Sequence, residues 1–529
     1  MENSKKKTQF IVMAMVVLIV LTRALTISHN MELHADEHVF YTAAQSLKGY
    51  LSGSSPIYEE VKEYPEGAIV MQLPFHIMTA VINRLFNCSI TPQLSGRIAA
   101  VFYFTAGAVL GCIILYRYFS QKPLYMMLYS LILVFSIRHI IQSRYGTADA
   151  ITLFLLMAVL LLTAESMTRI HCYRYLFAAF FAAGALGASK YPLFFFAAIP
   201  VYGMVVLFKQ TAREKRILIT LAALAFLYFG FAVLSPKAAF DPMYIWRAST
   251  REIGAYMASG GTSLFEAVWT RFMSILTYSM LYSGFPLAPI FFIIGARYMR
   301  LACDKGKSAQ RLFAMVIPIL TAIFFTYNLF VSLLVFRTYY PFFFISDLYA
   351  VMAIGRWAET GKIKRFAVCL LTVIMLARSI YFIYLLSDRN DKTHVAELIS
   401  NVVDDEWSTT TILSGYVILP DDYNTYPGLS IIDSDDERFL DSEGIALTEG
   451  ELFIAGARDF TVYSRCFNFL PSLYDDNVDS LSWIAFRNAN SQYYAGALYP
   501  DYIYYLFGYW LMGNDGCYEF PAFRVFYRA

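Results

Sequence analysis

The sequence predicts an α-helical, multi-pass membrane protein of about eleven spans, N-terminus inside and C-terminus outside, with a small C-terminal α/β soluble domain. Hydrophobic residues make up 58% of the 529 residues and charged residues only 16%, and the mean hydropathy is +0.50. A soluble fold could not cover so much apolar surface, so the chain belongs in a bilayer. The net charge of +2, with basic residues in short clusters, indicates no nucleic-acid partner.

Each predicted span is an apolar segment close to the roughly 20 residues that cross a bilayer. The spans are 10–27, 94–116, 124–137, 148–164, 175–189, 192–208, 217–234, 272–294, 312–335, 339–355 and 366–386. The first span follows Lys5, Lys6 and Lys7 but has no small-residue cleavage site after it. We therefore interpret it as a retained helix and not as a removed signal peptide.

Segment 68–85 is also long enough to cross, but Pro74, His76, Asn83 and Arg84 interrupt it. A charge at mid-bilayer costs about 2.5–3.5 kcal/mol. If this segment does not span, the short loops of one face hold seventeen Lys and Arg residues, whereas the opposite face beyond the long first loop holds eight. Basic loops stay in the cytoplasm, so we predict that the segment is interfacial, on the outer membrane surface, and that the C-terminus is outside.

The composition changes beyond Asp388, which divides the chain into a transmembrane domain (1–386, with a first outer loop at 28–93) and an extracytoplasmic domain (387–529). In the second domain, a helical stretch at 393–403 precedes short β-prone runs. These runs are 410–419, 429–432, 452–455 and 460–463. Cys466 and Cys517 in this domain could form a disulfide or be two free thiols.

The predicted topology brings the notable polar residues of the helical domain to one face, at the outer ends of the spans. They are Asp36 and Glu37 in the first outer loop, Arg144 and Asp149 in the second, Lys190 and Tyr191 in the third, and Arg337 near the fifth. A transporter more often has ionisable groups within its spans, near the membrane midplane. Clustering at helix ends therefore favours an enzyme.

Four motifs in this order resemble the polytopic GT-C glycosyltransferases, particularly the protein O-mannosyltransferase and aminoarabinose transferase branch. They are Asp36-Glu37 after the first span, the 143–149 segment SRYGTAD, Ser189-Lys190-Tyr191, and the 337–341 segment RTYYP. The resemblance covers roughly residues 10–386. It implies a polyprenyl-phosphate-sugar donor, a glycan, lipid or protein acceptor, and an outward-facing site, which we expect in the plasma membrane of a prokaryote, among membrane lipids.

The residue types suit this chemistry, because a lipid phosphate leaves without protonation, so that one general base and a cationic cradle suffice. By hypothesis Asp36 takes the proton of the acceptor hydroxyl, Glu37 orients acceptor or base, and the single displacement inverts the anomeric carbon. Arg144, Lys190 and Arg337 are the candidates for binding the donor phosphate. Further substrate-binding candidates are Tyr64 and Glu66, in the stretch that leads into segment 68–85. Asp149, Tyr191 and Tyr340, from the matched motifs, are candidates too.

Other interpretations of these residues stay open. Asp149 could cap the helix at 148–164, and an outer arginine could simply snorkel to the membrane interface. His34, Asp36 and His38 alternate, so on an extended segment they could bind a divalent metal. For the whole protein, the alternatives are a transporter or flippase of lipid-linked glycans and a polymerase or ligase of such glycans.

Overall fold

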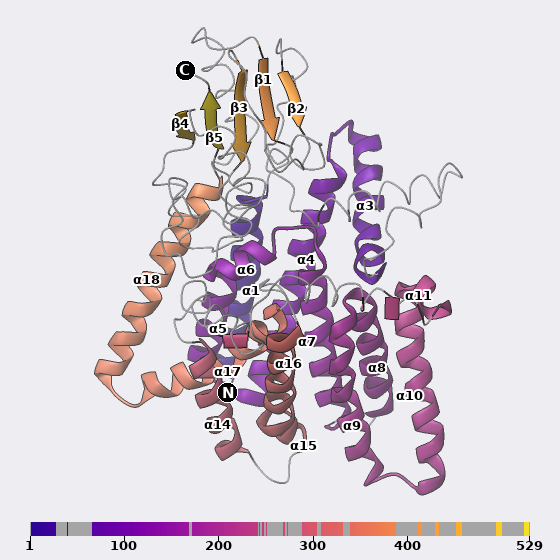
Figure 1. Ribbon diagram of the computed structural model, residues 1–529. Helices are drawn as coiled ribbons and strands as arrows, with labels where there is room; N and C mark the ends of the chain where they lie inside the picture. Colours follow the sequence, from indigo (N-terminus) through magenta and orange to yellow (C-terminus); the bar gives the residue numbers. More distant parts are fainter. Residues whose placement is uncertain are drawn as a thin grey trace. The chain divides into compact units, whose positions relative to one another are not determined.

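The structure is a computed structural model, which describes residues 2–27, 37, 40, 66–168, 172–241, 243, 246–247, 250, 268–269, 272, 288–303, 308–331 and 339–387 and five strands between residues 410 and 527. The chain forms two compact units. One comprises residues 1–27 and 35–384, and the other comprises residues 28–34 and 385–529. Figure 1 shows the elements of both units.

The first unit is helical in its described part. Its α-helices are α1 (Glu2–Ala24), α3 (Glu66–Phe86), α4 (Pro92–Ile114), α5 (Pro123–Phe135), α6 (Ile137–Gln142), α7 (Ala148–Ser166), α8 (Cys172–Ser189), α9 (Ala198–Phe208), α10 (Arg213–Leu234), α11 (Pro236–Phe240), α14 (Ala288–Ala302), α15 (Ser308–Arg311), α16 (Ile317–Val331), α17 (Tyr340–Glu359) and α18 (Lys362–Ser387). A 3-10 helix precedes α9 (Tyr191–Ala197), and π-helical turns follow α4 (Leu115–Phe119) and α15 (Leu312–Val316).

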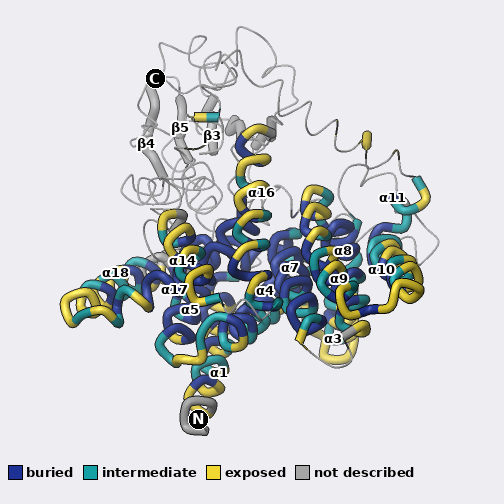
Figure 2. Tube along the Cα trace, turned by 90° about the horizontal axis from the view of Figure 1, so that it is seen from below, coloured by how far each residue is buried: buried dark blue, intermediate teal, exposed yellow. Residues whose placement is uncertain are grey.

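Seven helical segments of the described residues are long and apolar enough to cross a membrane. They are Lys6–Ala24, Glu66–Phe86, Pro92–Phe119, Ala148–Ser166, Tyr191–Phe208, Arg213–Leu234 and Ser308–Phe330. Figure 2 shows that α7 is largely buried among its neighbours, whereas α10 is exposed along much of its length. The exposed side chains of α10 include Ile217, Leu218 and Leu221, which is the pattern of a helix that faces lipid. The protein is therefore an integral, multi-pass membrane protein.

Helices α8 and α10 approach each other through two glycines. A Cβ on Gly184 would lie 2.0 Å from the carbonyl oxygen of Leu227, and a Cβ on Gly230 would lie 2.1 Å from that of Phe181. Small residues at such crossings let helix backbones come close in a membrane, where packing drives association. Helices α8 and α10 therefore form a close backbone contact, and α8 also packs against α7.

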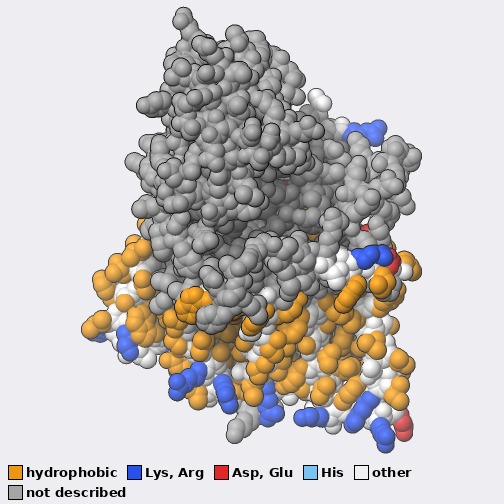
Figure 3. Space-filling model, in the orientation of Figure 1, with side chains coloured by type: hydrophobic (Ala, Val, Ile, Leu, Met, Phe, Trp, Pro, Cys, Tyr) orange, Lys and Arg blue, Asp and Glu red, His pale blue; other side chains and the backbone are white. Residues whose placement is uncertain are grey.

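One end of the helical unit carries basic side chains in ion pairs. Arg117 contacts Glu165 where α4 and α7 end, and Lys122 Nζ lies 2.7 Å from Glu359 Oε1, where α5 begins and α17 ends. Figure 3 shows hydrophobic side chains over most of the described helical surface on one face and Lys and Arg gathered along its edge, where α10 begins and α14 ends. This segregation agrees with the clustering of basic loops on one predicted face.

Helix α3 begins at the opposite end, next to the last residues of α8 and α10. Glu66 accepts a hydrogen bond of 3.1 Å from Ser235, and a Cβ on Gly67 would meet the backbone of Ala188. The rest of α3 runs antiparallel to the start of α4 and is bonded to it by Tyr103–Met71 (2.7 Å) and Thr79–Ser95 (3.1 Å). Asn83 also donates to the carbonyl of Ile90, just before α4 (2.8 Å). The non-spanning, interfacial placement expected for 68–85 stays a prediction, because α3 is itself long and apolar enough to cross a membrane. Helix α3 runs alongside α4, whereas the sequence suggested a helix lying along the membrane surface.

The described part of the second unit is a five-stranded sheet in the order β2-β1-β3-β5-β4. Its strands are β1 (Thr410–Ser414), β2 (Leu429–Ile432), β3 (Glu451–Gly456), β4 (Tyr494–Tyr499) and β5 (Phe523–Tyr527). β1 is parallel to β2 and β3, and β5 is antiparallel to β3 and β4. The predicted runs 429–432 and 452–455 coincide with β2 and β3, and 410–419 overlaps β1, which covers its first five residues. The rest of that run, the predicted helix at 393–403 and the predicted strand at 460–463 lie outside the described residues.

Candidate active site

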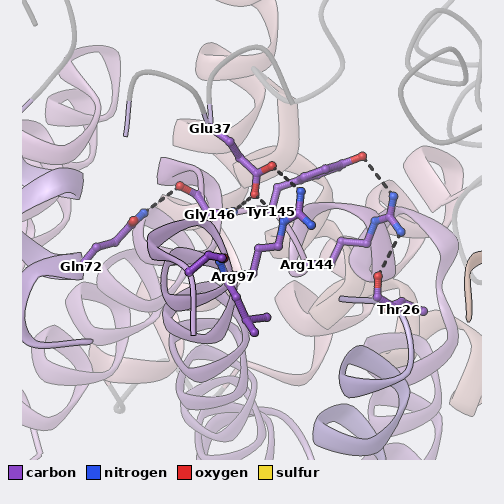
Figure 4. A network of polar contacts seen from close by, with 9 residues as sticks. Thr26, Glu37, Gln72, Arg97, Arg144, Tyr145 and Gly146 are labelled. Carbon is purple, nitrogen blue, oxygen red and sulfur yellow. Dashed lines mark hydrogen bonds and ion pairs between the residues drawn. The ribbon is translucent and has the colours of Figure 1, made fainter. Parts of the chain in front are cut away.

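The candidate site forms where α4 meets the segment between α6 and α7. Gly96 and Gly146 allow this approach, because a Cβ on Gly146 would lie 3.0 Å from the carbonyl carbon of Gly96. From the neighbouring helix α3, the Gln72 side chain donates a hydrogen bond of 2.9 Å to the Gly146 carbonyl. Figure 4 shows the resulting network of Gln72, Gly146, Arg97 and Glu37. Four stretches of chain are thereby held together at this end of the helices.

Glu37, the second residue of the predicted acidic pair, is anchored in this network. Arg97 donates from Nε to Oε1 (3.0 Å) and from Nη2 to Oε2 (2.8 Å), and the Gly146 backbone N–H donates to Oε1 (2.7 Å). The side chains of Arg97 and Glu37 are 0% and 4% exposed. A buried carboxylate is stable only when paired and hydrogen-bonded, and a two-pronged guanidinium contact with an added N–H provides this. Glu37 is thus held in place, which suits an orienting role better than proton transfer.

Arg144 is buried beside this pair. Its Nη2 donates to the Tyr145 hydroxyl (3.0 Å) and its Nη1 to the Thr26 carbonyl just after α1 (3.4 Å). The Tyr145 ring lies between two cations, since the guanidinium carbons of Arg144 and Arg97 are 4.9 and 5.9 Å from its centre. This cation–π arrangement concentrates positive charge where α1 ends and α4 and α7 begin (Figure 4).

Asp149 and Lys190 form an ion pair next to this cluster. Lys190 Nζ lies 3.1 Å from Asp149 Oδ1, and the two side chains are 23% and 5% exposed. The alternative that Asp149 caps α7 is wrong, because the N-cap residue is Thr147 and Asp149 lies within the first turn. Lys190 directly follows α8, so this pair connects the second and third predicted outer loops.

The remaining predicted residues are distributed differently. Asp36, Tyr64 and Arg337 lie outside the described residues, as do His34 and His38. Glu66 starts α3 and bonds Ser235, and Tyr191 begins the 3-10 helix directly after Lys190. Tyr340 is buried in the first turn of α17, where it contacts His139.

A second buried cluster joins α6 to α17. His139 Nδ1 lies 2.8 Å from the Tyr340 hydroxyl and His139 Nε2 lies 2.8 Å from Asp347 Oδ2, while Arg138 contacts Asp347 Oδ1. All four side chains are at most 3% exposed. Burial lowers the pKa of His139 to about 4, although its hydrogen bond to Asp347 acts in the opposite direction, so the ring is neutral at pH 7.

Sequence reasoning missed Arg97, Gln72, Arg138, His139 and Asp347. The available signal was a lone ionisable residue inside an apolar segment, since Arg97 is the one charged residue of 94–116 and Asp347 the one acid of 339–355. Such residues are costly in a bilayer and by default suggest a functional or paired position. In the described ranges, no group of three or more His, Cys, Asp or Glu side chains could hold a metal ion.

The fold and site together define a polytopic membrane protein with a buried, predominantly cationic cluster at one end of its helices. No protein-family model matches the sequence, and no curated protein matches it significantly. Among solved structures, ArnT from Cupriavidus metallidurans bound to undecaprenyl phosphate is similar at 12% identity and a TM-score of 0.45, over 84% of this chain and 92% of that chain.

Two archaeal structures are similar at the same level. The oligosaccharyltransferase AglB from Archaeoglobus fulgidus, in complex with an inhibitory peptide and a dolichol-phosphate, has 12% identity and a TM-score of 0.47 over 86% of this chain and 70% of that chain. An Archaeoglobus fulgidus oligosaccharyltransferase in complex with Zn and sulfate has 13% identity and a TM-score of 0.46 over 93% and 72% of the respective chains.

Proposed function

We propose that the protein is a membrane glycosyltransferase that transfers a sugar from a polyprenyl-phosphate-linked donor to an acceptor hydroxyl on the outer face of the membrane. The main support is the contact of Glu37 with Arg97 and Gly146. It joins the Asp36-Glu37 motif to the 143–149 motif, two of the four on which the resemblance to GT-C enzymes rests. Residues of two motifs about a hundred positions apart are thus in contact at the helix ends, which supports one shared site at the membrane surface.

The proposed reaction is a single displacement. The acceptor oxygen forms a bond to the anomeric carbon while Asp36 accepts its proton, and the bond from that carbon to the phosphate oxygen breaks. The bonding electron pair leaves with the lipid phosphate, whose charge cationic side chains stabilise. The anomeric configuration inverts, and Glu37 orients the segment that carries Asp36.

Arg144, Lys190 and Arg337 are the proposed phosphate-binding cations. Arg144 supplies fixed positive charge from a buried position, whereas Lys190 is partly exposed and paired with Asp149. A phosphate that reaches Lys190 would compete with Asp149 for its ammonium group. Lys190 would therefore exchange its partner when the donor binds, whereas Arg144 would not. Tyr64, Glu66, Tyr191 and Tyr340 remain proposed substrate-binding residues.

The proposed topology has eleven spans, with the N-terminus in the cytoplasm and the site outside, in a prokaryotic plasma membrane. Residues 1–386, with the outer loop 28–93, form the catalytic domain, and residues 387–529 form an extracytoplasmic α/β domain, to which the parallel strands β1, β2 and β3 lend support. A divalent metal held by His34, Asp36 and His38 stays a prediction, since these residues are outside the described ranges.

Two native cysteines test this topology, because Cys88 is exposed between α3 and α4 and Cys303 follows α14 at the basic end. In variants that retain one cysteine each, an impermeant thiol reagent should label Cys88 in intact cells and Cys303 only after permeabilisation. Labelling of Cys303 in intact cells would reverse the sidedness, and protection of Cys88 there would make α3 a span.

The function itself is tested by mass spectrometry of lipid extracts and surface glycans, with and without the gene. Loss of the protein should remove one sugar from a surface glycan, lipid or protein and leave its polyprenyl-phosphate-linked form in excess, because the donor is no longer consumed. Unchanged glycans together with a lipid-linked glycan retained on the cytoplasmic face would instead indicate a flippase.

The phosphate-binding cations are tested by single substitutions. Lys190→Ala and Arg337→Ala should each weaken donor use at least about tenfold, because a charge-assisted phosphate contact is lost. Arg247→Ala is the control, since this arginine pairs with Asp241 and is 63% exposed. Initial rates over a range of donor concentrations provide the measurement. Equal rates for all three variants at equal expression would refute the phosphate assignments.

A further inference from the structure

A buried chain of hydrogen bonds runs from Asp347 through His139 to Tyr340 and connects α6 to α17 at two places. His139 contacts Tyr340 in the first turn of α17 and Asp347 two turns later, at 2.8 Å in both cases. Arg138 provides a second contact to Asp347, and its guanidinium carbon lies 5.0 Å from the centre of the Phe343 ring. Asp347 therefore contacts two residues of α6, Arg138 and His139. Tyr340 contacts α6 through His139.

The neighbours of His139 determine which ring nitrogen carries its hydrogen. Asp347 faces the Arg138 guanidinium, which favours the charged carboxylate, and a carboxylate can only accept. Nε2 therefore carries the hydrogen and donates it to Asp347, and Nδ1 is an acceptor. The Tyr340 hydroxyl must then donate to Nδ1. With all of these side chains buried, the hydrogen-bond directions along the chain are defined from end to end.

The two helices that these hydrogen bonds join are close in the sequence to proposed phosphate-binding residues. Helix α6 ends at Gln142, and Arg144 follows two residues later. Helix α17 begins at Tyr340, and Arg337 precedes it by three residues in the sequence. A contact between α6 and the first turn of α17 therefore holds the end of α6 in place, from which the backbone continues to Arg144.

We propose that His139 is a positioning residue for the lipid-phosphate site. By accepting the hydrogen bond of Tyr340, it keeps the start of α17 and the end of α6 at a fixed position relative to each other. This inference rests on the proposed function. His139 touches neither substrate nor reacting atoms, and it acts by holding the start of α17 against α6. Asp347 and Arg138 orient the imidazole so that its acceptor nitrogen faces Tyr340.

Two substitutions separate the two hydrogen bonds of His139. The side-chain oxygen of His139→Asn can take the position of Nδ1 and accept from Tyr340, although it no longer reaches Asp347. The side-chain nitrogen of His139→Gln can take the position of Nε2 and donate to Asp347, but the variant lacks the acceptor for Tyr340. Tyr340→Phe removes the same bond from the other side.

The experiment measures binding of a short-chain polyprenyl phosphate, without sugar, to the purified full-length protein in detergent, together with Tm and the KM and kcat of sugar transfer. His139→Gln and Tyr340→Phe should each raise Kd and donor KM about tenfold with kcat within about threefold, since one buried hydrogen bond that holds the site is lost. His139→Asn should stay within about threefold of the wild type. The double variant His139→Gln/Tyr340→Phe should be no worse than either single one, because both remove the same bond.

The outcomes separate this inference from the proposed function. If the wild type binds the lipid phosphate and His139→Gln binds it equally well, the positioning role is refuted, even where Tm falls. Equal weakening by His139→Asn and His139→Gln would also refute it, because the Tyr340 bond would then not be the one that matters. If the wild type neither binds the lipid phosphate nor transfers sugar, the proposed function fails and the inference fails with it.

Discussion

Asp36→Asn is expected to lower sugar transfer at least about a hundredfold, since general-base catalysis contributes about 10² to 10⁴ in rate. The amide keeps the shape of the carboxylate but cannot take the proton of the acceptor hydroxyl. Folding and donor binding should therefore be largely retained. The measurement is transfer by purified protein from a defined polyprenyl-phosphate donor, after gel filtration in detergent shows that variant and wild type elute alike.

Glu37→Gln is the matched control for this prediction. Its carboxylate is held by three donors, two from Arg97 and one from Gly146, so its substitution should disturb position more than proton transfer. We expect a smaller loss of rate than for Asp36→Asn, together with a lower Tm. If Asp36→Asn keeps more than about a tenth of the activity, Asp36 is not the base, and Asp149 becomes the next carboxylate to test.

Arg97→Ala is expected to lower the free energy of unfolding by about 3–5 kcal/mol, because it leaves the buried carboxylate of Glu37 without its partner. Arg97→Lys should lie between this variant and the wild type, since an ammonium keeps the charge but not the two-pronged contact. Thermal unfolding in detergent gives the order of the variants. Arg247→Ala, which breaks an exposed pair with Asp241, should leave Tm nearly unchanged.

A double variant separates stability from activity at the same position. Glu37→Leu combined with Arg97→Met replaces the pair by apolar side chains of similar volume, which is often neutral for stability. We expect its Tm to return close to that of the wild type, while sugar transfer stays low, because the segment that carries Asp36 has lost its anchor. Wild-type Tm for Arg97→Ala would show that the pair does not hold this part of the fold. Full activity of the double variant would show that catalysis does not need it.

The sequence predicted the helical elements well where apolar segments are long and uninterrupted. The ranges 148–164 and 217–234 fall within α7 and α10. Segment 124–137 was expected to be one span, but α5 ends at Phe135 and α6 restarts at Ile137, with Ser136 extended between them. Hydropathy alone does not reveal such a break, since residues on both sides of it are apolar.

The candidate site was predictable as far as loop position determines it. Arg144, Asp149 and Lys190 could be assigned to one face by counting spans, and the pairing of Asp149 with Lys190 is compatible with that assignment. The contacts of Glu37 with Arg97 and of His139 with Asp347 join residues 60 and 208 positions apart. A single sequence does not select these partners among the many charges available, because selection depends on how the helices pack.

Arg23 bears on how the protein is made. Its buried guanidinium bonds Ser143 and the carbonyl oxygens of Leu133 and Val134 at the end of α5, which lie 110 and 111 residues further along the chain. During synthesis α1 therefore enters the bilayer with a cation whose partners have not yet been translated. Until α5 arrives, this side chain must reach the aqueous boundary, as arginines near helix ends do. Helix α1 thus acquires its final contacts only after α5 and α6 have been made, so assembly of the helical unit requires α1 to pack against neighbours that are synthesised later.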